Sequence, residues 1–401
     1  MEVDGSSVSL PEEIIFDVLS WLPVKSLIRF RCVSKGWRLL ISDPAFIATH
    51  KSRAAPLLVG SFVVPHDPTN TRNLGEAPEL RVMDMDGNVL RVFKDVAGTV
   101  LSPSRLDLVC VDEGRQGAHV IDPTTGQVLT VGRYVDDPMA DFLDVLGGPP
   151  FYRFGRATPS GEYKVVRLLG THMWLDLIGH VCEVVTLGGS TGLSWRTRQN
   201  SPIRFCLCDG CTVAINGVIY FMPYGAHAQQ GLWNRVGRFD LESEVWKAMI
   251  DGPPELRRPK PGQRLLAIGE LKSTLTMVET IQSPYTSAYI WLLVDSERSM
   301  WVKGYTVQSV NMLYRVKPLE VLRDGRLLLL KTFETNGVSL QLYDFNTGTC
   351  TNLMDMPMEF KGGITLYTGN LLSSDRGYLL LRIKGRCSAI SLRRKKQFTA
   401  A

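Results

Sequence analysis

The sequence predicts a multidomain α+β protein, in which a small all-α domain of three short helices precedes an all-β propeller of about six to seven blades. Three observations lead to this prediction. Apolar residues near the N-terminus recur at helical spacing, the rest of the chain consists of short apolar runs separated by Gly, Pro, Asp and Ser, and a strand–turn–strand unit recurs along those runs. Units that repeat at intervals of about 50 residues are typical of propeller blades.

The N-terminal helices are expected between residues 9 and 50. Ser9–Glu12 has the S-x-x-E form of a capping box, and apolar residues at helical spacing follow it. Pro23 ends this first helix and can start the second. Ser34 can cap a third helix, which ends at Asp43-Pro44.

The segment from Leu10 to Ile47 is unusually apolar for its length, because 21 of its 38 residues are apolar. Chains below roughly 40 residues rarely bury enough surface to fold without a metal, a disulfide or a partner. The segment holds one cysteine and no histidine, so neither a metal nor a disulfide is available within it. Either these helices dock on the rest of the chain as a cap, or another protein covers them.

Three runs occur in order in this segment: Leu10-Pro-Glu-Glu-Ile-Ile15, Leu19-x-x-Leu-Pro-Val-Lys-Ser-Leu27 and Arg31-Cys-Val-Ser-Lys-x-Trp37. Together they resemble an F-box, a small helical module that binds a Skp-type adaptor, which in turn binds a cullin. The resemblance implies a substrate-receptor subunit of an SCF-type ubiquitin ligase. It places the adaptor contacts on nine residues, of which some, Trp37 especially, could equally hold the helices together: Leu10, Pro11, Ile14, Leu19, Leu22, Pro23, Leu27, Val33 and Trp37.

The remainder of the chain has the short, regularly punctuated strands of an all-β domain. The expected strands are 57–64, 79–85, 88–93, 106–111, 119–121, 127–131, 164–169, 182–187, 213–215, 218–222, 236–240, 265–269, 274–279, 288–294, 301–305, 319–322, 326–333, 339–343, 364–367, 378–384 and 387–392. Strand 57–64 is expected to close the ring by pairing with the last blade, because closure hides the edge strands.

The recurring unit has an aspartate at the start of a turn, with markers at residues 84, 122, 186, 240, 295 and 344, of which 186 is a threonine. Each aspartate is expected to accept a hydrogen bond from the backbone two residues further on. The Trp or apolar residue after the turn is expected to pack between blades. The stretches 121–126 and 160–166 are similar to the Kelch-like F-box-associated domains of plant F-box proteins, with Asp-Pro-Thr in place of the usual Asn-Pro-x-Thr.

The expected organisation is a disordered N-terminus (1–8), the F-box (9–50), a linker (51–56), the propeller (57–392) and a basic tail (393–401). Residues 381–401 hold seven basic side chains and no acid, so the net charge of +5 leaves about −2 for the rest of the chain. A solvated tail is the simplest interpretation, and a nuclear-localisation signal is the alternative. The tail is too short to predict a nucleic-acid partner.

Several classes of protein find no support in the sequence. No apolar run approaches the roughly 18 residues of a membrane span, and acids stand where a secretory signal has a basic flank. The eight scattered cysteines therefore indicate reduced thiols in the cytoplasm, the nucleus or both. No P-loop, strand-borne G-x-G-x-x-G or H-E-x-x-H predicts a cofactor or a catalytic role. Cys206-x-Cys208-x-x-Cys211 offers at most three of the four zinc ligands, which leaves metal binding open.

Four long loops, 66–78, 134–150, 223–235 and 251–264, are candidates for binding a protein substrate. They carry aromatic and basic groups of the kind that anchor interfaces: Trp233, Arg235, Arg257 and Arg258. The main hypothesis is a non-catalytic ligase adaptor. The alternatives are a propeller enzyme or glycan-binding lectin with a helical cap, and an interaction protein that binds the adaptor but delivers nothing for degradation.

Overall fold

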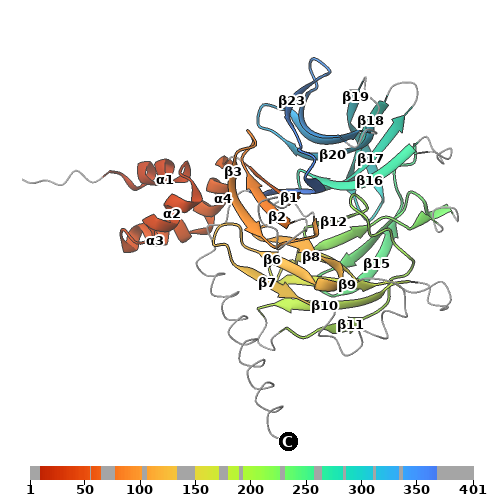
Figure 1. Ribbon diagram of the computed structural model, residues 1–401, viewed down its shortest axis with the longest axis horizontal. Helices are drawn as coiled ribbons and strands as arrows, with labels where there is room; N and C mark the ends of the chain where they lie inside the picture. Colours follow the sequence, from red (N-terminus) through yellow and green to blue (C-terminus); the bar gives the residue numbers. More distant parts are fainter. Residues whose placement is uncertain are drawn as a thin grey trace, which may run out of the picture.

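The computed structural model describes residues 10–54, 56–64, 77–101, 106–132, 150–170, 179–188, 193–225, 231–256, 264–282, 286–309, 313–333 and 337–367. A group of short helices stands beside a much larger ring of sheets (Figure 1). Among the described residues, no helix has both the length and the apolar character needed to cross a membrane. The expected strands 378–384 and 387–392 and the basic tail lie outside the described residues.

The helical domain contains the three expected helices and a fourth that was not expected. The helices are α1 (Glu12–Ser20), α2 (Val24–Phe30), α3 (Lys35–Ser42) and α4 (Pro44–Arg53). Asp43 caps α4, because its Oδ1 accepts the backbone N–H groups of Ala45 and Phe46 at 2.8 and 3.2 Å. Asp43-Pro44 therefore ends one helix and begins another, and residues 51–53, expected in a linker, are helical.

The other three helix starts differ in their caps, and that of α2 is Pro23, which makes no side-chain hydrogen bond. Ser34 caps α3 as expected, and its Oγ accepts the Trp37 backbone N–H at 3.1 Å. The N-cap of α1 is Pro11, which has no side-chain hydrogen bond, and Ser9 lies outside the described residues. The four helices enclose a small core of their own, formed by Leu19, Leu27, Ile41, Phe46 and Ile47.

The all-β domain is a propeller of six blades, each a four-stranded antiparallel sheet. From the innermost strand outward, the first three blades are β24 (Phe360–Tyr367), β1 (Leu57–Val64), β2 (Ala77–Met83) and β3 (Val89–Lys94); β4 (Thr99–Val100), β5 (Val109–Asp112), β6 (Ala118–Ile121) and β7 (Val128–Val131); and β8 (Phe151–Arg156), β9 (Tyr163–Leu169), β10 (Val181–Leu187) and β11 (Arg196–Arg198).

The remaining three blades have the same order. They are β12 (Thr212–Ile215), β13 (Val218–Phe221), β14 (Val236–Asp240) and β15 (Val245–Ile250); β16 (Arg264–Leu271), β17 (Thr274–Gln282), β18 (Thr286–Asp295) and β19 (Met300–Ser309); and β20 (Leu313–Val321), β21 (Leu327–Phe333), β22 (Val338–Asp344) and β23 (Thr349–Asp355). Five of these strands, β4, β8, β11, β15 and β23, were not expected from the sequence.

The ring closes through the expected strand, Leu57–Val64. This strand, β1, pairs antiparallel with β24 in a register that joins Leu58 to Leu366 and Gly60 to Ile364. The chain therefore completes its first blade with its last described strand, rather than adding its first strand to the last blade. Pairing the two ends of the domain in one sheet closes the ring of blades.

The turn chemistry expected from the marker positions is confirmed at Asp84, Asp122, Asp295 and Asp344. Asp240 instead accepts the N–H of Ser243, three residues further on, and Thr186 accepts from Arg196. Oδ1 of Asp122 accepts the Thr124 N–H at 2.8 Å, and Oδ1 of Asp344 accepts the Asn346 N–H at 2.8 Å. The residues after the turns pack between blades, as expected. Trp246 lies against the core shared by blades three and four, and Trp301 belongs to the core shared by blades four and five.

The helical domain sits on one face of the ring, at the ends of the inner strands. Leu57, which follows α4 closely, pairs with Tyr367 at the end of β24. Lys51 of α4 forms an ion pair with Asp107, in the connection after β4. Arg323, after β20, donates to the Ser52 carbonyl. We call this face proximal, and the opposite face, where the inner strands begin, distal.

Candidate functional site

One side of α1 presents an apolar stripe to solvent. Ile14, Val18 and Trp21 are separated by four and three positions, so they lie on one face of α1 and its C-cap. Leu10 precedes the helix. The exposed fractions of Leu10, Ile14, Val18 and Trp21 are 60, 47, 55 and 58%. The other side of α1 also carries apolar residues, and these pack into the helical core. These exposed fractions are those of the side chains in the complete chain, with the propeller present, so the propeller does not cover the stripe.

The structure divides the nine residues proposed for adaptor contact into two groups. Leu10, Pro11, Ile14, Pro23 and Val33 are exposed. The other four build the domain: Leu19 and Leu27 are buried in the helical core, and Leu22 and Trp37 are half-buried against it. The Trp37 ring lies edge-on to Phe30, with ring centroids 5.5 Å apart. Leu19 and Leu27 therefore position the helices and offer no surface for contact.

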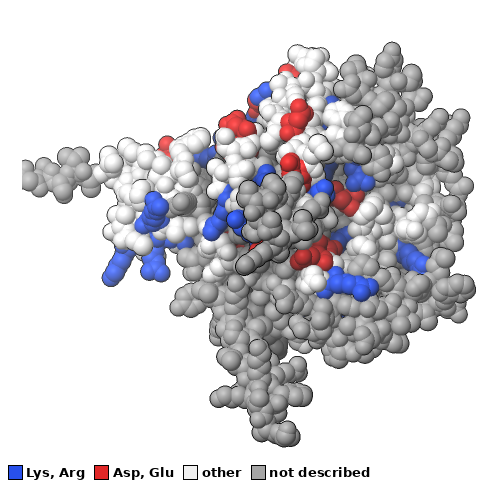
Figure 2. All heavy atoms as spheres, in the orientation of Figure 1, with Lys and Arg blue, Asp and Glu red and all other residues white. Residues whose placement is uncertain are grey.

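Three exposed apolar side chains of the helical domain were missed in the sequence: Val18, Trp21 and Leu39, the last 73% exposed. Val18 could have been found, because it follows Ile14 by four positions on the same helix. The Trp21 ring lies 4.9 Å from the guanidinium carbon of Arg53. In the view of Figure 2, the visible face of the helical domain is largely uncharged, with basic side chains toward its lower part.

The distal face has a charged cavity at the mouth of the central channel. The cavity has a volume of about 280 Å³ and is lined by residues of β4, β8 and β12 and the loops before them. Arg153 lies in its wall, 5% exposed, with Nη1 3.5 Å from Oδ2 of Asp112 and Nη2 2.5 Å from the Leu207 carbonyl. Asp209 lies 3.7 Å from Nζ of Lys317.

Burial and the neighbouring opposite charge shift the pKa values of Asp112 and Arg153 in opposite directions. Burial raises the pKa of Asp112, and the adjacent Arg153 guanidinium partly offsets that effect. Burial likewise lowers the pKa of Arg153, against the influence of Asp112. The Lys317 ammonium lowers the pKa of Asp209. The mouth of the channel is therefore polar and holds charges of both signs.

Three thiols meet beside this cavity, in the loop before β12. Sγ of Cys208 is 2.7 Å from Sγ of Cys206 and 3.2 Å from Sγ of Cys211, and all three sulfurs lie within 4.8 Å of one another. Hydrogen bonds from the Cys208 and Cys211 thiols lower the pKa of Cys206 well below its ordinary value. The sequence motif thus becomes a compact sulfur cluster.

The four residues proposed for substrate binding have different positions. Trp233 is half-buried against the core between blades four and five. Arg235 is exposed, and its Nε lies 2.6 Å from Oδ1 of Asp251. Both precede β14, whose start lies on the distal face because β14 runs parallel to the inner strand β12 of its own sheet. Arg257 and Arg258 lie outside the described residues.

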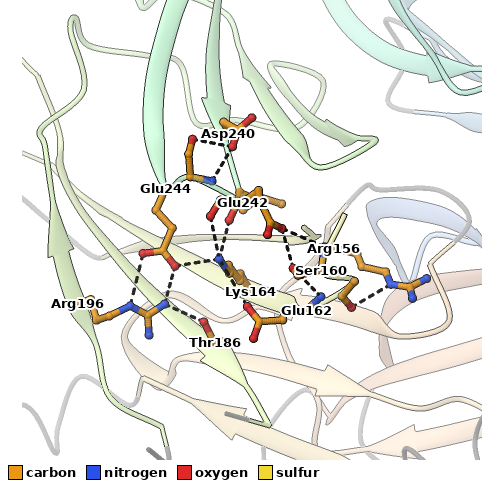
Figure 3. Close-up of polar contacts among 12 residues, drawn as sticks. Arg156, Ser160, Glu162, Lys164, Thr186, Arg196, Asp240, Glu242 and Glu244 are labelled. Carbon is orange, nitrogen blue, oxygen red and sulfur yellow. Dashed lines mark hydrogen bonds and ion pairs between the residues drawn. The ribbon is translucent and has the colours of Figure 1, made fainter. Parts of the chain in front are cut away.

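A polar network joins blades three and four on the proximal side (Figure 3). Oε1 of Glu244 lies 3.0 Å from Nζ of Lys164 and 2.6 Å from Nη2 of Arg196. Ser160 Oγ donates to Glu242 at 2.6 Å, and Lys164 Nζ donates to the Leu241 carbonyl at 2.7 Å. The family-like stretch 160–166 therefore contributes a contact between blades.

The chain thus has two parts, a small helical domain with an exposed apolar face and a six-bladed propeller. Residues 8–49 match the family model of the F-box domain, and residues 51–361 match that of the F-box associated beta propeller domain. The chain therefore belongs to the family of F-box proteins with an associated propeller. The expected resemblance to plant F-box proteins is confirmed by relatives from Arabidopsis thaliana.

Two relatives indicate how far the similarity extends. The F-box protein CPR1 of Arabidopsis thaliana is 25% identical over 97% of this chain and 93% of its own length. The putative F-box protein At1g30920 of Arabidopsis thaliana is 25% identical over 84% of both chains. Among solved structures, TolB from Acinetobacter baumannii aligns with a TM-score of 0.39 at 13% identity, covering 81% of this chain and 70% of its own, which is too remote to inform function.

Proposed function

We propose that this protein is the substrate receptor of an SCF-type ubiquitin ligase. Its helical domain binds a Skp-type adaptor and, through it, a cullin, while the propeller holds a protein substrate. The observation that supports this proposal best is the exposed stripe of Leu10, Ile14 and Val18 on a domain that already has its own core. Exposed apolar surface that gathers on one side of a helix is typical of a docking face.

The position of the stripe favours docking over a simple cap. The helical domain contacts the propeller through α4, where Lys51 pairs with Asp107. The α1 stripe stays exposed in the whole chain. A cap would instead bury its apolar side chains against the ring. Burial of such side chains by a partner contributes roughly 25 cal/mol per Å² of apolar surface.

The receptor acts through proximity and supplies no nucleophile. Binding a substrate to the propeller raises the concentration of its lysines near a ubiquitin-charged enzyme that the cullin brings. The distal face, with its charged cavity and the loop that carries Trp233 and Arg235, is the proposed substrate surface. We propose that this function is carried out in the cytoplasm, the nucleus or both.

The adaptor contact can be tested with single substitutions on the stripe. Ile14→Asp and Val18→Asp each place a charge where the adaptor would bury an apolar group, without altering the helical core. We expect each to weaken binding to a purified Skp-type adaptor by roughly thirty-fold, the effect of losing about 2 kcal/mol at a central contact. Isothermal titration calorimetry of the full chain gives the dissociation constants.

Met358→Asp is the matched control, because Met358 is a 94% exposed apolar residue in the turn before β24, on the propeller. It should bind the adaptor as wild type does. The circular dichroism spectrum must be unchanged in all variants. Wild-type protein that does not bind the adaptor, or stripe variants that bind it as tightly as the control, would disprove the proposed function.

A further inference from the structure

The loop between β11 and β12 brings three cysteines of one short motif together, with spacing C-x-C-x-x-C. The sulfur atoms of Cys206, Cys208 and Cys211 all lie within 4.8 Å of one another. Within the described part of the chain, these three thiols form the one group of His, Cys, Asp or Glu side chains whose ligand atoms lie close enough together to hold a metal ion. It lies at the channel mouth, on the face opposite the helical domain.

The backbone holds this loop in place from two sides. The Cys206 N–H donates to the Met222 carbonyl at 2.8 Å, and the Met222 N–H donates to the Cys211 carbonyl at 2.9 Å, which fixes both ends of the motif to the end of β13. On the other side, the Ile268 N–H of β16 donates to the Gly210 carbonyl at 2.7 Å. A ligand loop that is ordered before the ion arrives loses little conformational entropy on binding.

Basic groups surround the loop. Arg315 Nη1 donates to the Asp209 carbonyl at 2.5 Å, and Arg153 Nη2 donates to the Leu207 carbonyl at 2.5 Å. Both carbonyls lie between the cysteines in sequence. Three thiolates around a divalent ion carry a net charge of about −1, which two guanidinium groups nearby would stabilise. The carboxylates of Asp209 and Asp112 lie beside the same two guanidinium groups, at 3.8 and 3.5 Å, so the surroundings of the loop hold charges of both signs.

We propose that Cys206, Cys208 and Cys211 bind one Zn²⁺ ion through their three sulfurs, with a fourth coordination position open to the channel-mouth cavity. Thiolates select soft ions such as Zn²⁺, whose bonds to sulfur are about 2.3 Å long. A tetrahedral site therefore needs sulfurs about 3.8 Å apart. Two of the observed separations, 2.7 and 3.2 Å, are shorter than that value, and all three sulfurs lie within 4.8 Å of one another, so small side-chain movements that part these two pairs would fit the ion.

The cavity explains why the fourth position stays open. Cys208 is exposed and lines the cavity of about 280 Å³, together with Asp112 and Arg153. His180 accepts the Phe205 backbone N–H through Nε2 at 3.0 Å, and it does not belong to the group of converging ligand atoms. A water molecule, or a donor atom of a bound protein, would complete the coordination from the cavity. On binding, each thiol that still carries a proton releases it to solvent.

The test is metal content and metal replacement in the full chain, purified without a metal-binding tag under reducing conditions. After addition of Zn²⁺ and dialysis, plasma mass spectrometry should find about one zinc per chain. Replacement by Co²⁺ should give thiolate-to-cobalt charge-transfer absorption in the near ultraviolet. Cys206→Ser, Cys208→Ser and Cys211→Ser should each lower the zinc content by about tenfold and remove that absorption.

Cys32→Ser is the matched control, because Cys32 is exposed on the helical domain, far from the motif in sequence. It should retain the full zinc content. Wild-type protein with less than about a tenth of a zinc per chain overturns the proposal, and so does an intact mass showing a disulfide within the motif in reduced protein. The cobalt spectrum of wild type decides the question even where a serine variant fails to fold. Adaptor binding is measured separately, so it can fail without affecting this result.

Discussion

Individual carboxylates have two different structural roles in this propeller. Asp122 accepts backbone N–H groups within its own turn, and so fixes the shape of one hairpin. Glu244 instead reaches side chains of the neighbouring blade, Lys164 and Arg196, and so fixes how two blades meet. The first role can be read from local sequence, because an Asx turn depends on adjacent residues. The second depends on partners about 50 to 80 positions away.

Glu244→Gln should lower the free energy of unfolding at pH 7 by roughly 3 kcal/mol, because it leaves buried and half-buried cations without their anion. Glu244 is 8% exposed and faces Lys164, Arg196 and Arg198. The measurement is chemical denaturation followed by tryptophan fluorescence. Glu242→Gln, at an exposed carboxylate of the same turn, is the control and should cost less than about 1 kcal/mol.

The effect of Glu244→Gln on the free energy of unfolding should depend on pH, and the direction of that dependence follows from the pKa of Glu244. Burial alone would raise the pKa of Glu244, but hydrogen bonds from Arg196, Lys164 and Arg198 more than offset it and lower the pKa to about 2, from 4.5. A depressed folded-state pKa stabilises the protein above the unfolded value, and this contribution is lost as pH falls from about 4.5 toward about 2. The difference between wild type and Glu244→Gln should therefore shrink over that range. A constant difference would contradict the assignment.

At the scale of elements, the sequence predicted most of the strands that are buried on both sides. β9 is buried along its whole length, and it was expected almost to the residue. Two inner strands were nevertheless missed: β4 has only two residues, and Arg153 and Gly155 interrupt the apolar run of β8, although four of its six residues are buried. The other three missed strands are of another kind. β11, β15 and β23 are the outermost strands of their blades and are little buried. β11 and β23 are largely polar and show no apolar run, whereas β15 is mostly apolar but shows no alternation. These three strands form because each pairs with the next strand inward in its blade.

The candidate site was predictable to a similar degree. The apolar content of the first helices indicated a docking face, but not which side chains face outward, because α1 is apolar on two sides. Only packing against α4 separates Leu19, which is buried, from Val18, which is exposed. The cysteine motif was visible in the sequence. The convergence of its sulfurs depends on hydrogen bonds to β13 and β16, which no local pattern shows.

The closing strand β24 provides a test at this scale. Ile364 is fully buried in the core that joins the first and last blades. Ile364→Ala should therefore lower the free energy of unfolding by roughly 2–5 kcal/mol, the range for large-to-small changes in cores. Val89→Ala, at a 47% exposed position on the outer strand β3, should cost less than about 1 kcal/mol.

Calorimetry would show whether closure couples all six blades. Because β24 seals the ring, we expect Ile364→Ala to lower the temperature of a single unfolding transition rather than to split it. Two separate transitions of the propeller in the variant would mean that the first blade unfolds independently, contrary to a cooperative closed ring.

For the whole molecule, the proposed function depends on how the two domains are joined. Helix α4 runs to Arg53 and β1 starts at Leu57, so the junction is too short to act as a flexible tether. Lys51 and Ser52 of α4 also contact the propeller through Asp107 and Arg323. The docking stripe and the distal face are therefore held at a fixed separation, on opposite ends of the molecule.

Inserting a Gly/Ser-rich segment of about ten residues after Ala54 should remove that fixed separation while leaving both domains intact. The helical core and the ring closure lie wholly within their own domains, so affinity for the Skp-type adaptor should stay within about twofold of wild type. Distances between a spin label on α3 and one on β18, measured by pulsed electron paramagnetic resonance, should change from a narrow to a broad distribution. An equally narrow distribution after insertion would show that side-chain contacts alone fix the orientation. In that case Lys51→Met and Arg323→Ala together, added to the insertion, should broaden it, because they remove the ion pair to Asp107 and the hydrogen bond to the Ser52 carbonyl.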